Sequence, residues 1–151
     1  EYVKSLLEGA GLAVTLVPDP SGGKANLFAS TGPAGVGGIM LSGHTDVVPV
    51  EGQLWTKPPF ALTETDGRYY GRGAADMKGF VACVLALVPE FAALPLARPI
   101  HIALSYDEEI GCRGVPHPFG DGHAGERACE ALADAATDPR GPRVLRKRNE
   151  F

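Results

Sequence analysis

The sequence contains 151 residues, of which 44% are hydrophobic and 21% are charged, a composition typical of a globular domain rather than a disordered chain. This length is sufficient for one hydrophobic core. The formal net charge of −4 argues against broad binding to nucleic acid or to an anionic membrane, since both require a basic face. We therefore expect small-molecule ligands, with no nucleic acid and no membrane as partners.

The cysteines also restrict the class of protein. Cys83, Cys112 and Cys129 are odd in number and show no Cys-x-x-Cys spacing, which favours neither a disulfide framework nor a thiolate zinc site. No apolar run is long enough to span a bilayer, and the start of the sequence lacks the pattern of a signal peptide. We therefore expect a cytoplasmic protein. Because the sequence enters a helical pattern directly at Glu1, we also expect the chain to begin inside a longer protein.

The first part of the chain predicts one helix followed by strands. Residues 2–7 have the apolar spacing of the last turns of an amphipathic helix, which the following glycines end. Residues 12–17 and 25–29 are predicted strands. The Gly/Pro-rich segment 30–38 is predicted to be a turn.

The next part predicts a strand, a helix and another strand. Residues 38–42 form a short apolar run of the type that is buried on both faces of a parallel sheet. Residues 54–70 mix proline and glycine with apolar residues, which indicates loop and short strand. A helix is predicted from Met77, with Pro89 either kinking it or ending it early. Residues 100–105 are the next apolar strand.

This order of elements predicts the fold class. Strand, helix and strand, with polar residues just past the strands, is the pattern of an open α/β sheet in which ligands bind at the carboxyl ends. We therefore predict an α/β fold with a mostly parallel central sheet flanked by helices for residues 1–114. The segment 115–151 lacks apolar periodicity, so we expect a poorly packed or out-of-frame tail that limited proteolysis removes first.

A histidine and an aspartate follow the predicted strand 38–42. His44 and Asp46 are two residues apart, and in extended backbone such side chains point to the same side. Asp46 could then hold one ring nitrogen of His44 while the other nitrogen binds metal. The alternative is a surface turn in which Asp46 caps local N–H groups and His44 is solvated. Taken alone, so short a motif favours the alternative.

Asp76 lies between a glycine-rich turn, residues 71–73, and the predicted helix from Met77. Taken alone, it is best interpreted as an N-cap that accepts hydrogen bonds from the first helical N–H groups. The N-terminus of a helix also stabilises negative charge, which suits a carboxylate that bridges two cations. The two roles are compatible.

Three adjacent carboxylates, Asp107, Glu108 and Glu109, follow the predicted strand 100–105. Such a run repels itself unless it is solvated, as in an ordinary loop, or neutralised by a cation. Successive side chains of extended backbone point to opposite sides, so one glutamate could bind metal while its neighbour faces the attacking water. One imidazole with several carboxylates suits Zn²⁺, Co²⁺ or Mn²⁺ and predicts a metal-dependent hydrolase.

The remaining histidines are weaker candidates. His101 begins an apolar strand and is predicted to be structural rather than a ligand. His117 and His123 fall in the irregular segment after residue 114, where a solvated loop is expected.

Taken together, the motifs resemble the ArgE/DapE (M20-type) group of metallo-aminoacylases and peptidases. The resemblance rests on the order and spacing of residues 41–49 (LSGHTDVVP), 55–60, 70–79 (YGRGAADMKG) and 103–109 (ALSYDEE). Residues 104–112 are most similar to the acetylornithine deacetylase branch. Residues 58–60 (PPF) and 73–76 (GAAD) are shared with the succinyl-diaminopimelate desuccinylases and do not separate the two branches.

The resemblance implies a role for each candidate residue. His44 would bind one metal ion, Asp76 would bridge two ions and Glu109 would bind the second. Asp46 would support His44, and Glu108 would be the general base. The implied ions are Zn²⁺ or Co²⁺, two of them in the full-length family. The resemblance also implies a cis peptide bond after Asp76.

The implied reaction is hydrolysis of N2-acetyl-L-ornithine to L-ornithine and acetate, a step of arginine biosynthesis with a small N-acyl amino acid as substrate. Two alternatives are a desuccinylase-like amidohydrolase and a truncated product that binds metal without catalysis. The resemblance covers residues 1–114, without the later ligands and the lid and dimerisation domain through which full-length members would form homodimers. We therefore expect no measurable deacetylase activity from the isolated chain, even with excess zinc or cobalt.

Overall fold

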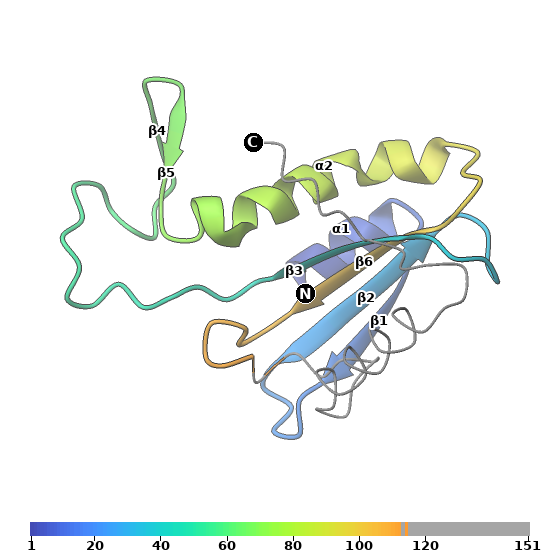
Figure 1. Ribbon diagram of the computed structural model, residues 1–151, viewed down its shortest axis with the longest axis horizontal. Helices are drawn as coiled ribbons and strands as arrows, with labels where there is room; N and C mark the ends of the chain where they lie inside the picture. The colour runs from blue at the N-terminus through green and yellow to red at the C-terminus, as the bar shows by residue number, and fades with distance from the viewer. Residues whose placement is uncertain (113, 115–151) are drawn as a thin grey trace, which may run out of the picture. The chain divides into compact units, whose positions relative to one another are not determined.

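The computed structural model describes residues 1–112 and 114 (Figure 1). Its elements in chain order are α1 (Tyr2–Gly9), β1 (Ala13–Pro18), β2 (Ala25–Thr31), β3 (Ile39–His44), β4 (Thr63–Thr65), β5 (Arg68–Tyr70), the one-turn helix η1 (Ala74–Lys78), α2 (Gly79–Ala93) and β6 (Ile100–Ser105). The predicted helices and strands are therefore present. Helix α2 continues through Pro89 to Ala93, so the proline does not end it early. The predicted tail, 115–151, lies outside the described residues.

The central sheet has four strands in the order β1-β2-β6-β3, and β4 and β5 form a separate hairpin. Strand β1 pairs antiparallel with β2, β2 pairs antiparallel with β6, and β6 pairs parallel with β3. The α/β class is confirmed, but the expectation of a mostly parallel sheet is not met in the described part of the chain. The short turn 19–24 between β1 and β2 allows only antiparallel pairing, because a parallel connection needs a long crossover. Helix α2 provides such a crossover between β3 and β6.

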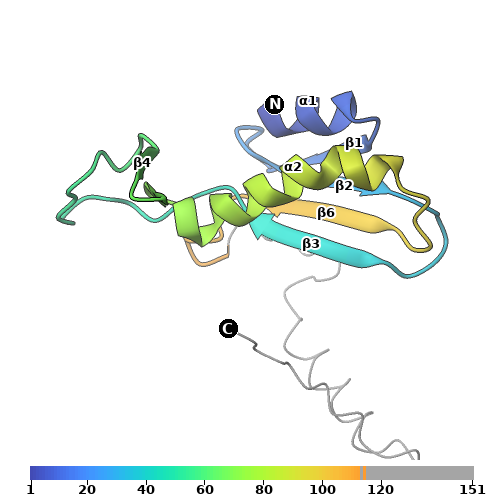
Figure 2. The ribbon, with the colours of Figure 1, turned by 90° about the horizontal axis from the view of Figure 1, so that it is seen from above.

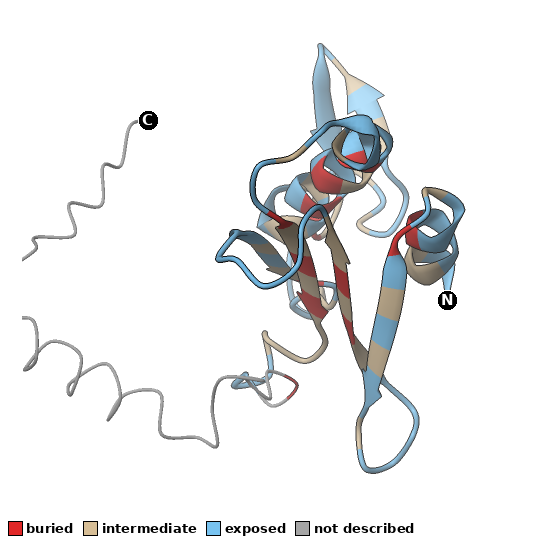
Figure 3. Ribbon diagram, turned by 90° about the vertical axis from the view of Figure 1, so that its right-hand side faces the viewer, coloured by how far each residue is buried: buried red, intermediate tan, exposed pale blue. Residues whose placement is uncertain are grey.

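Helices α1 and α2 cover one face of this sheet (Figure 2). Buried side chains alternate along β2 and β6, as the two-residue period of a strand requires, and recur along α2 at helical spacing. The buried core consists of Leu7, Leu12, Leu27, Ala29, Val81, Val84, Val88, Ile102 and Leu104 (Figure 3). Burial of these side chains fixes which face of each strand points inward, and therefore its register.

The register of the parallel pair decides where the polar motifs lie. Ile39 is opposite Ile100 and His44 is opposite Ser105, so β3 and β6 end together. The segments that follow these strands therefore start at the same edge of the sheet. Neither α1 nor α2 is long and apolar enough to cross a membrane.

Candidate metal centre

The pairing of β3 with β6 continues one residue beyond the strands. The backbone N–H of Thr45 donates to the carbonyl oxygen of Ser105 at 2.9 Å, and the Thr45 hydroxyl donates to the same oxygen at 3.1 Å. These bonds hold the chain after His44 against the start of the segment that carries Glu108 and Glu109. The two motifs, far apart in the sequence, are thereby brought together.

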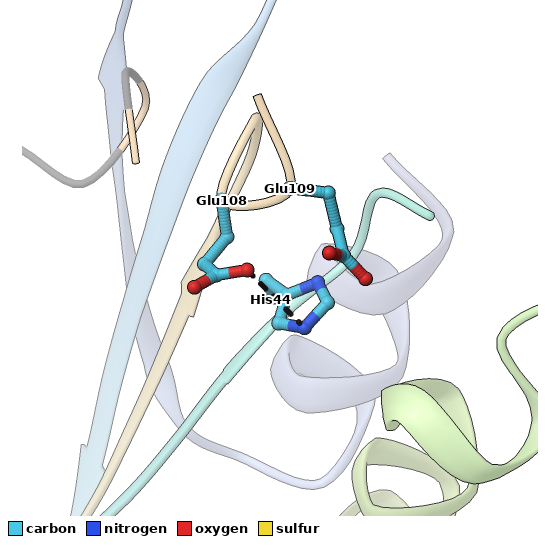
Figure 4. A group of neighbouring side chains, drawn as sticks. All are labelled: His44, Glu108 and Glu109. Atoms are coloured by element: carbon cyan, nitrogen blue, oxygen red, sulfur yellow. Dashed lines mark ion pairs between the residues drawn. The ribbon is translucent and has the colours of Figure 1, made fainter. Parts of the chain in front are cut away.

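His44 is buried, with only 6% of its surface exposed. Its Nδ1 donates to the carbonyl oxygen of Asp46 at 3.2 Å and lies 3.4 Å from Asp46 Oδ1. Its Nε2 lies 3.2 Å from Asp76 Oδ1. The same nitrogen lies 3.9 Å from Glu108 Oε2 (Figure 4). The alternative of a solvated His44 on a surface turn is therefore wrong. The predicted approach of the Asp46 carboxylate to one ring nitrogen is present at 3.4 Å, but the hydrogen bond from that nitrogen goes to the backbone carbonyl of Asp46.

Asp46 connects the two strand ends. Its Oδ2 accepts a hydrogen bond from the backbone N–H of Glu109 at 3.0 Å, a contact across the sheet edge rather than a local cap. Burial raises the pKa of Asp46, but the hydrogen bonds from the backbone N–H groups of Glu109 and Glu108 outweigh it and leave that pKa below its usual value. Asp46 therefore remains a carboxylate at neutral pH and places a negative charge 3.4 Å from His44 Nδ1.

Asp76 lies on η1 with an exposed side chain. The N-cap of α2 is Lys78, and η1 has no side-chain cap, so the interpretation of Asp76 as an N-cap is wrong. Its carboxylate instead faces His44 Nε2. The peptide bond between Asp76 and Met77 is cis, as the resemblance implied.

The three adjacent carboxylates take different directions. One ligand atom each of His44, Glu108 and Glu109 lie within 4.8 Å of one another (Figure 4). Asp107 instead pairs with Lys24 at 2.6 Å. Glu109 is half-buried, and its Oε1 is buried with no hydrogen-bond partner among the described residues. The segment is therefore not a solvated loop.

These side chains fit a divalent metal ion. A buried carboxylate oxygen without a hydrogen-bond partner is costly unless a cation or a donor satisfies it. Glu109 Oε1 is such an oxygen in the described part of the chain. The 3.2 Å between His44 Nε2 and Asp76 Oδ1 suits two donors of one ion, since each bond to zinc is about 2.0–2.2 Å long. Imidazole with carboxylates is a donor set that zinc and cobalt accept.

A cavity of about 450 Å³ opens beside the group. It is lined by Ser42, Gly43, His44, Asp76, Met77, Ser105, Glu108 and Cys112. Solvent can therefore reach the face of the group on which His44 Nε2 and Glu108 lie.

The electrostatic environment favours positive charge at His44. Burial lowers the pKa of His44, but the hydrogen bond to Asp76 and the contacts with Asp46 and Glu108 outweigh it, so that pKa is raised. The surroundings that stabilise a proton on the imidazole also favour a cation at its ring nitrogen.

Sequence patterns did not predict three contacts that support the site. Lys78 donates to the carbonyl oxygen of Thr45, Asn26 Oδ1 accepts the backbone N–H of Tyr106 at 3.3 Å, and Lys24 binds Asp107. Each joins segments that are distant in the sequence, so no local spacing could have signalled it.

The other histidines do not join the described cluster. His101 Nδ1 lies 2.9 Å from Ser30 Oγ, and its ring stacks on Phe28 with centroids 5.6 Å apart. It is structural, as predicted. His117 and His123 lie outside the described residues.

Comparison with known proteins identifies relatives. Residues 40–144 match the model of Peptidase family M20/M25/M40, a range that extends past residue 114. The chain is 43% identical to the acetylornithine deacetylase of Photorhabdus laumondii over 112 residues, which are 74% of this chain and 29% of that protein. It is 42% identical to the acetylornithine deacetylase of Proteus mirabilis over 110 residues, 72% of this chain and 28% of that protein. The chain thus spans less than a third of the length of these curated relatives.

Solved structures share the fold. Human carnosine dipeptidase 1 superimposes with a TM-score of 0.61 and 30% identity over 86% of this chain and 28% of that protein. The M20 family metallo-carboxypeptidase Sso-CP2 from Sulfolobus solfataricus gives a TM-score of 0.65 and 26% identity, over 76% of this chain and 26% of that protein.

Proposed function

Because this chain belongs to peptidase family M20/M25/M40, we propose that it carries part of the metal site of an amide hydrolase. The observation that supports this most is the convergence of His44, Glu108 and Glu109 at one sheet edge, with ligand atoms within 4.8 Å of one another. The buried Glu109 Oε1, which has no hydrogen-bond partner among the described residues, adds a reason for a cation there.

The proposed ligands are His44, through Nε2, with Asp76 and Glu109. Asp76 lines the cavity with Oδ1 3.2 Å from His44 Nε2, and its carboxylate would bridge two ions, zinc or cobalt, as the family resemblance implies. Asp46 orients the imidazole through Nδ1, which leaves the Nε2 lone pair for metal. The raised pKa of His44 and the lowered pKa of Asp46 are consistent with this division of roles.

Glu108 is the proposed general base. Its side chain is 40% exposed and lines the cavity, and its Oε2 lies 3.9 Å from His44 Nε2, so a water molecule near the proposed ligands is within its reach. A bound zinc or cobalt ion would polarise the amide carbonyl and lower the pKa of water. Glu108 would take the proton from the attacking water and donate it to the leaving amine.

The proposed substrate is a small N-acyl amino acid, specifically N2-acetyl-L-ornithine, which would yield L-ornithine and acetate. This proposal is supported by 43% and 42% identity to two acetylornithine deacetylases over most of this chain. The open cavity beside Glu108 admits a small substrate.

A chimera tests the proposed function. The segment of the Photorhabdus laumondii enzyme that matches this chain is replaced by the chain's own residues, and hydrolysis of N2-acetyl-L-ornithine and of N-succinyl-diaminopimelate is measured. We expect preferential hydrolysis of the acetyl substrate, which is lost with a chelator and restored by zinc or cobalt. Folded chimera without metal-dependent turnover would refute the proposal, and preference for the succinyl substrate would refute the proposed specificity.

Two glutamate variants of the chimera test the role of the general base. Glu108→Gln should lower kcat by about 10²- to 10⁴-fold, the usual contribution of a general base. Glu64→Gln, the same substitution at an exposed position on β4, should leave kcat unchanged. Equal activity of the two variants would exclude Glu108 as the base.

A further inference from the structure

We propose that Lys24 is a positioning residue for this site. Lys24 binds Asp107, the first of the three adjacent carboxylates after β6, so that the other two, Glu108 and Glu109, are the ones directed to His44. The inference rests on the proposed function, because it takes the cluster of His44, Glu108 and Glu109 as a metal site. Lys24 itself does not contact the cluster and would act through the segment after β6.

The contact between Lys24 and Asp107 occupies the whole carboxylate. Lys24 Nζ lies 2.6 Å from each of the two Asp107 oxygens and 5.9 Å from the centre of the Tyr106 ring. Asp107 has a φ of +52°, in the left-handed region that residues other than glycine rarely adopt. The ammonium group of Lys24 supplies an interaction from outside the segment that favours this turn.

The position of Lys24 is fixed by the turn between β1 and β2. Its backbone N–H donates to Asp19 Oδ1 at 3.2 Å, and its carbonyl accepts from the Asp19 N–H at 2.9 Å. Ser21 Oγ donates to Asp19 Oδ2 at 2.6 Å and closes the turn. From the same hairpin, Asn26 accepts the N–H of Tyr106. The hairpin thus holds the start of the carboxylate segment by two contacts.

The far side of the segment is held by Asp46, which accepts the Glu109 N–H at 3.0 Å. Glu108 and Glu109 can then present their carboxylates to His44 without rearrangement. The segment carries three adjacent carboxylates, and Asp107 would compete for a cation if it were free. The hydrogen bond to Asp107 raises the pKa of Lys24, so the lysine stays charged and keeps Asp107 occupied. We infer that Lys24 selects which carboxylates serve the site.

Cobalt titration of the 151-residue chain tests this role, because the direction of the change in Co²⁺ affinity separates it from a simple loss of charge. Lys24→Met should weaken Co²⁺ binding about 10-fold, the lower end of what outer-shell partners contribute to metal affinity. Loss of a nearby positive charge alone would have the opposite effect and tighten cation binding. Lys24→Arg should restore wild-type affinity, because arginine can bind the same carboxylate. Lys4→Met is the control: it breaks a different surface ion pair, that of Lys4 with Glu8, and should leave Co²⁺ affinity unchanged.

Hydrogen exchange of the metal-free chain provides a second readout that does not depend on metal. In Lys24→Met, the amides of residues 106–110 should exchange at least about threefold faster, whereas Lys4→Met should match wild type. Unchanged exchange, or unchanged or tighter Co²⁺ binding by Lys24→Met, would overturn the inference. If the wild-type chain bound no Co²⁺, the proposed metal site would be wrong, and the exchange rates would still decide whether Lys24 holds the segment.

Discussion

At the scale of single residues, the candidate metal centre depends on the contacts that orient each ligand side chain. The two-residue spacing of His44 and Asp46 allowed the approach of their side chains to be predicted as one of two alternatives, because alternation along extended backbone is a local property. The bond from the Glu109 N–H to Asp46 joins residues 63 apart in the sequence. It depends on the β3–β6 register, which no local pattern specifies. The pairing of Lys24 with Asp107 was missed for the same reason.

Removing the imidazole should remove most of the metal affinity. We predict that His44→Ala weakens Zn²⁺ binding by about 100-fold or more, because a ligand should contribute at least as much as its outer-shell partners. Isothermal titration calorimetry with the purified chain measures this. His101→Gln removes a different imidazole, one that contacts Ser30 and Phe28, and should leave zinc affinity unchanged. Equal zinc affinity of His44→Ala and wild type would exclude His44 as a ligand.

Zinc binding should also depend on pH through His44. The pKa of His44 is raised in the folded chain, so protonated His44 stabilises the metal-free fold. This stabilisation is fully present below 6.5, the pKa of histidine in the unfolded chain, and is lost as the pH rises through the folded pKa. Zinc competes with that proton, so its affinity should fall as pH decreases from about 8 to about 5.5. Calorimetry in buffers of different ionisation enthalpy measures the released proton. A pH-independent affinity over this range would contradict the proposed use of His44.

At the scale of elements, the crossover from β3 through α2 to β6 places the motifs. The apolar run 100–105 predicted β6 with its observed bounds, and the run 38–42 predicted β3, which continues to His44. Periodicity shows that a strand is buried but does not specify its partner. The antiparallel pairings of β2 could therefore not be read from the apolar pattern. Asp76 was misinterpreted as a cap because the kinked η1 precedes the regular helix.

The start of β3 should be sensitive to one added methyl group. A Cβ at Gly38 would overlap the backbone carbonyl of Pro99, which precedes β6 and accepts the Ile39 N–H at 3.0 Å. We predict that Gly38→Ala lowers the free energy of unfolding by about 1–3 kcal/mol, as overpacking usually does. Urea denaturation measures this change.

The neighbouring glycine provides the control for Gly38→Ala. A Cβ at Gly37 meets no atom within 4 Å, so Gly37→Ala should change stability little. If the two alanine variants were equally stable, the close approach of β3 to Pro99 would not be a constraint on the fold.

At the scale of the whole molecule, the described residues form an α/β unit whose polar motifs meet at the edge where β3 and β6 end. The α/β class followed from the order of apolar runs, and the family from the resemblance carried by the order and spacing of four segments. The chain spans 29% of the length of its Photorhabdus laumondii relative.

A crystal structure of the chain with zinc, with anomalous data at the zinc edge, tests the central claim most directly. We predict an anomalous peak about 2.0–2.2 Å from His44 Nε2 and from a carboxylate oxygen of Glu109. Crystals of His44→Ala under the same conditions should lack that peak. A zinc-saturated crystal with no peak at this edge of the sheet, and with His44 Nε2 still bonded only to Asp76, would contradict the assignment of this site to a metal.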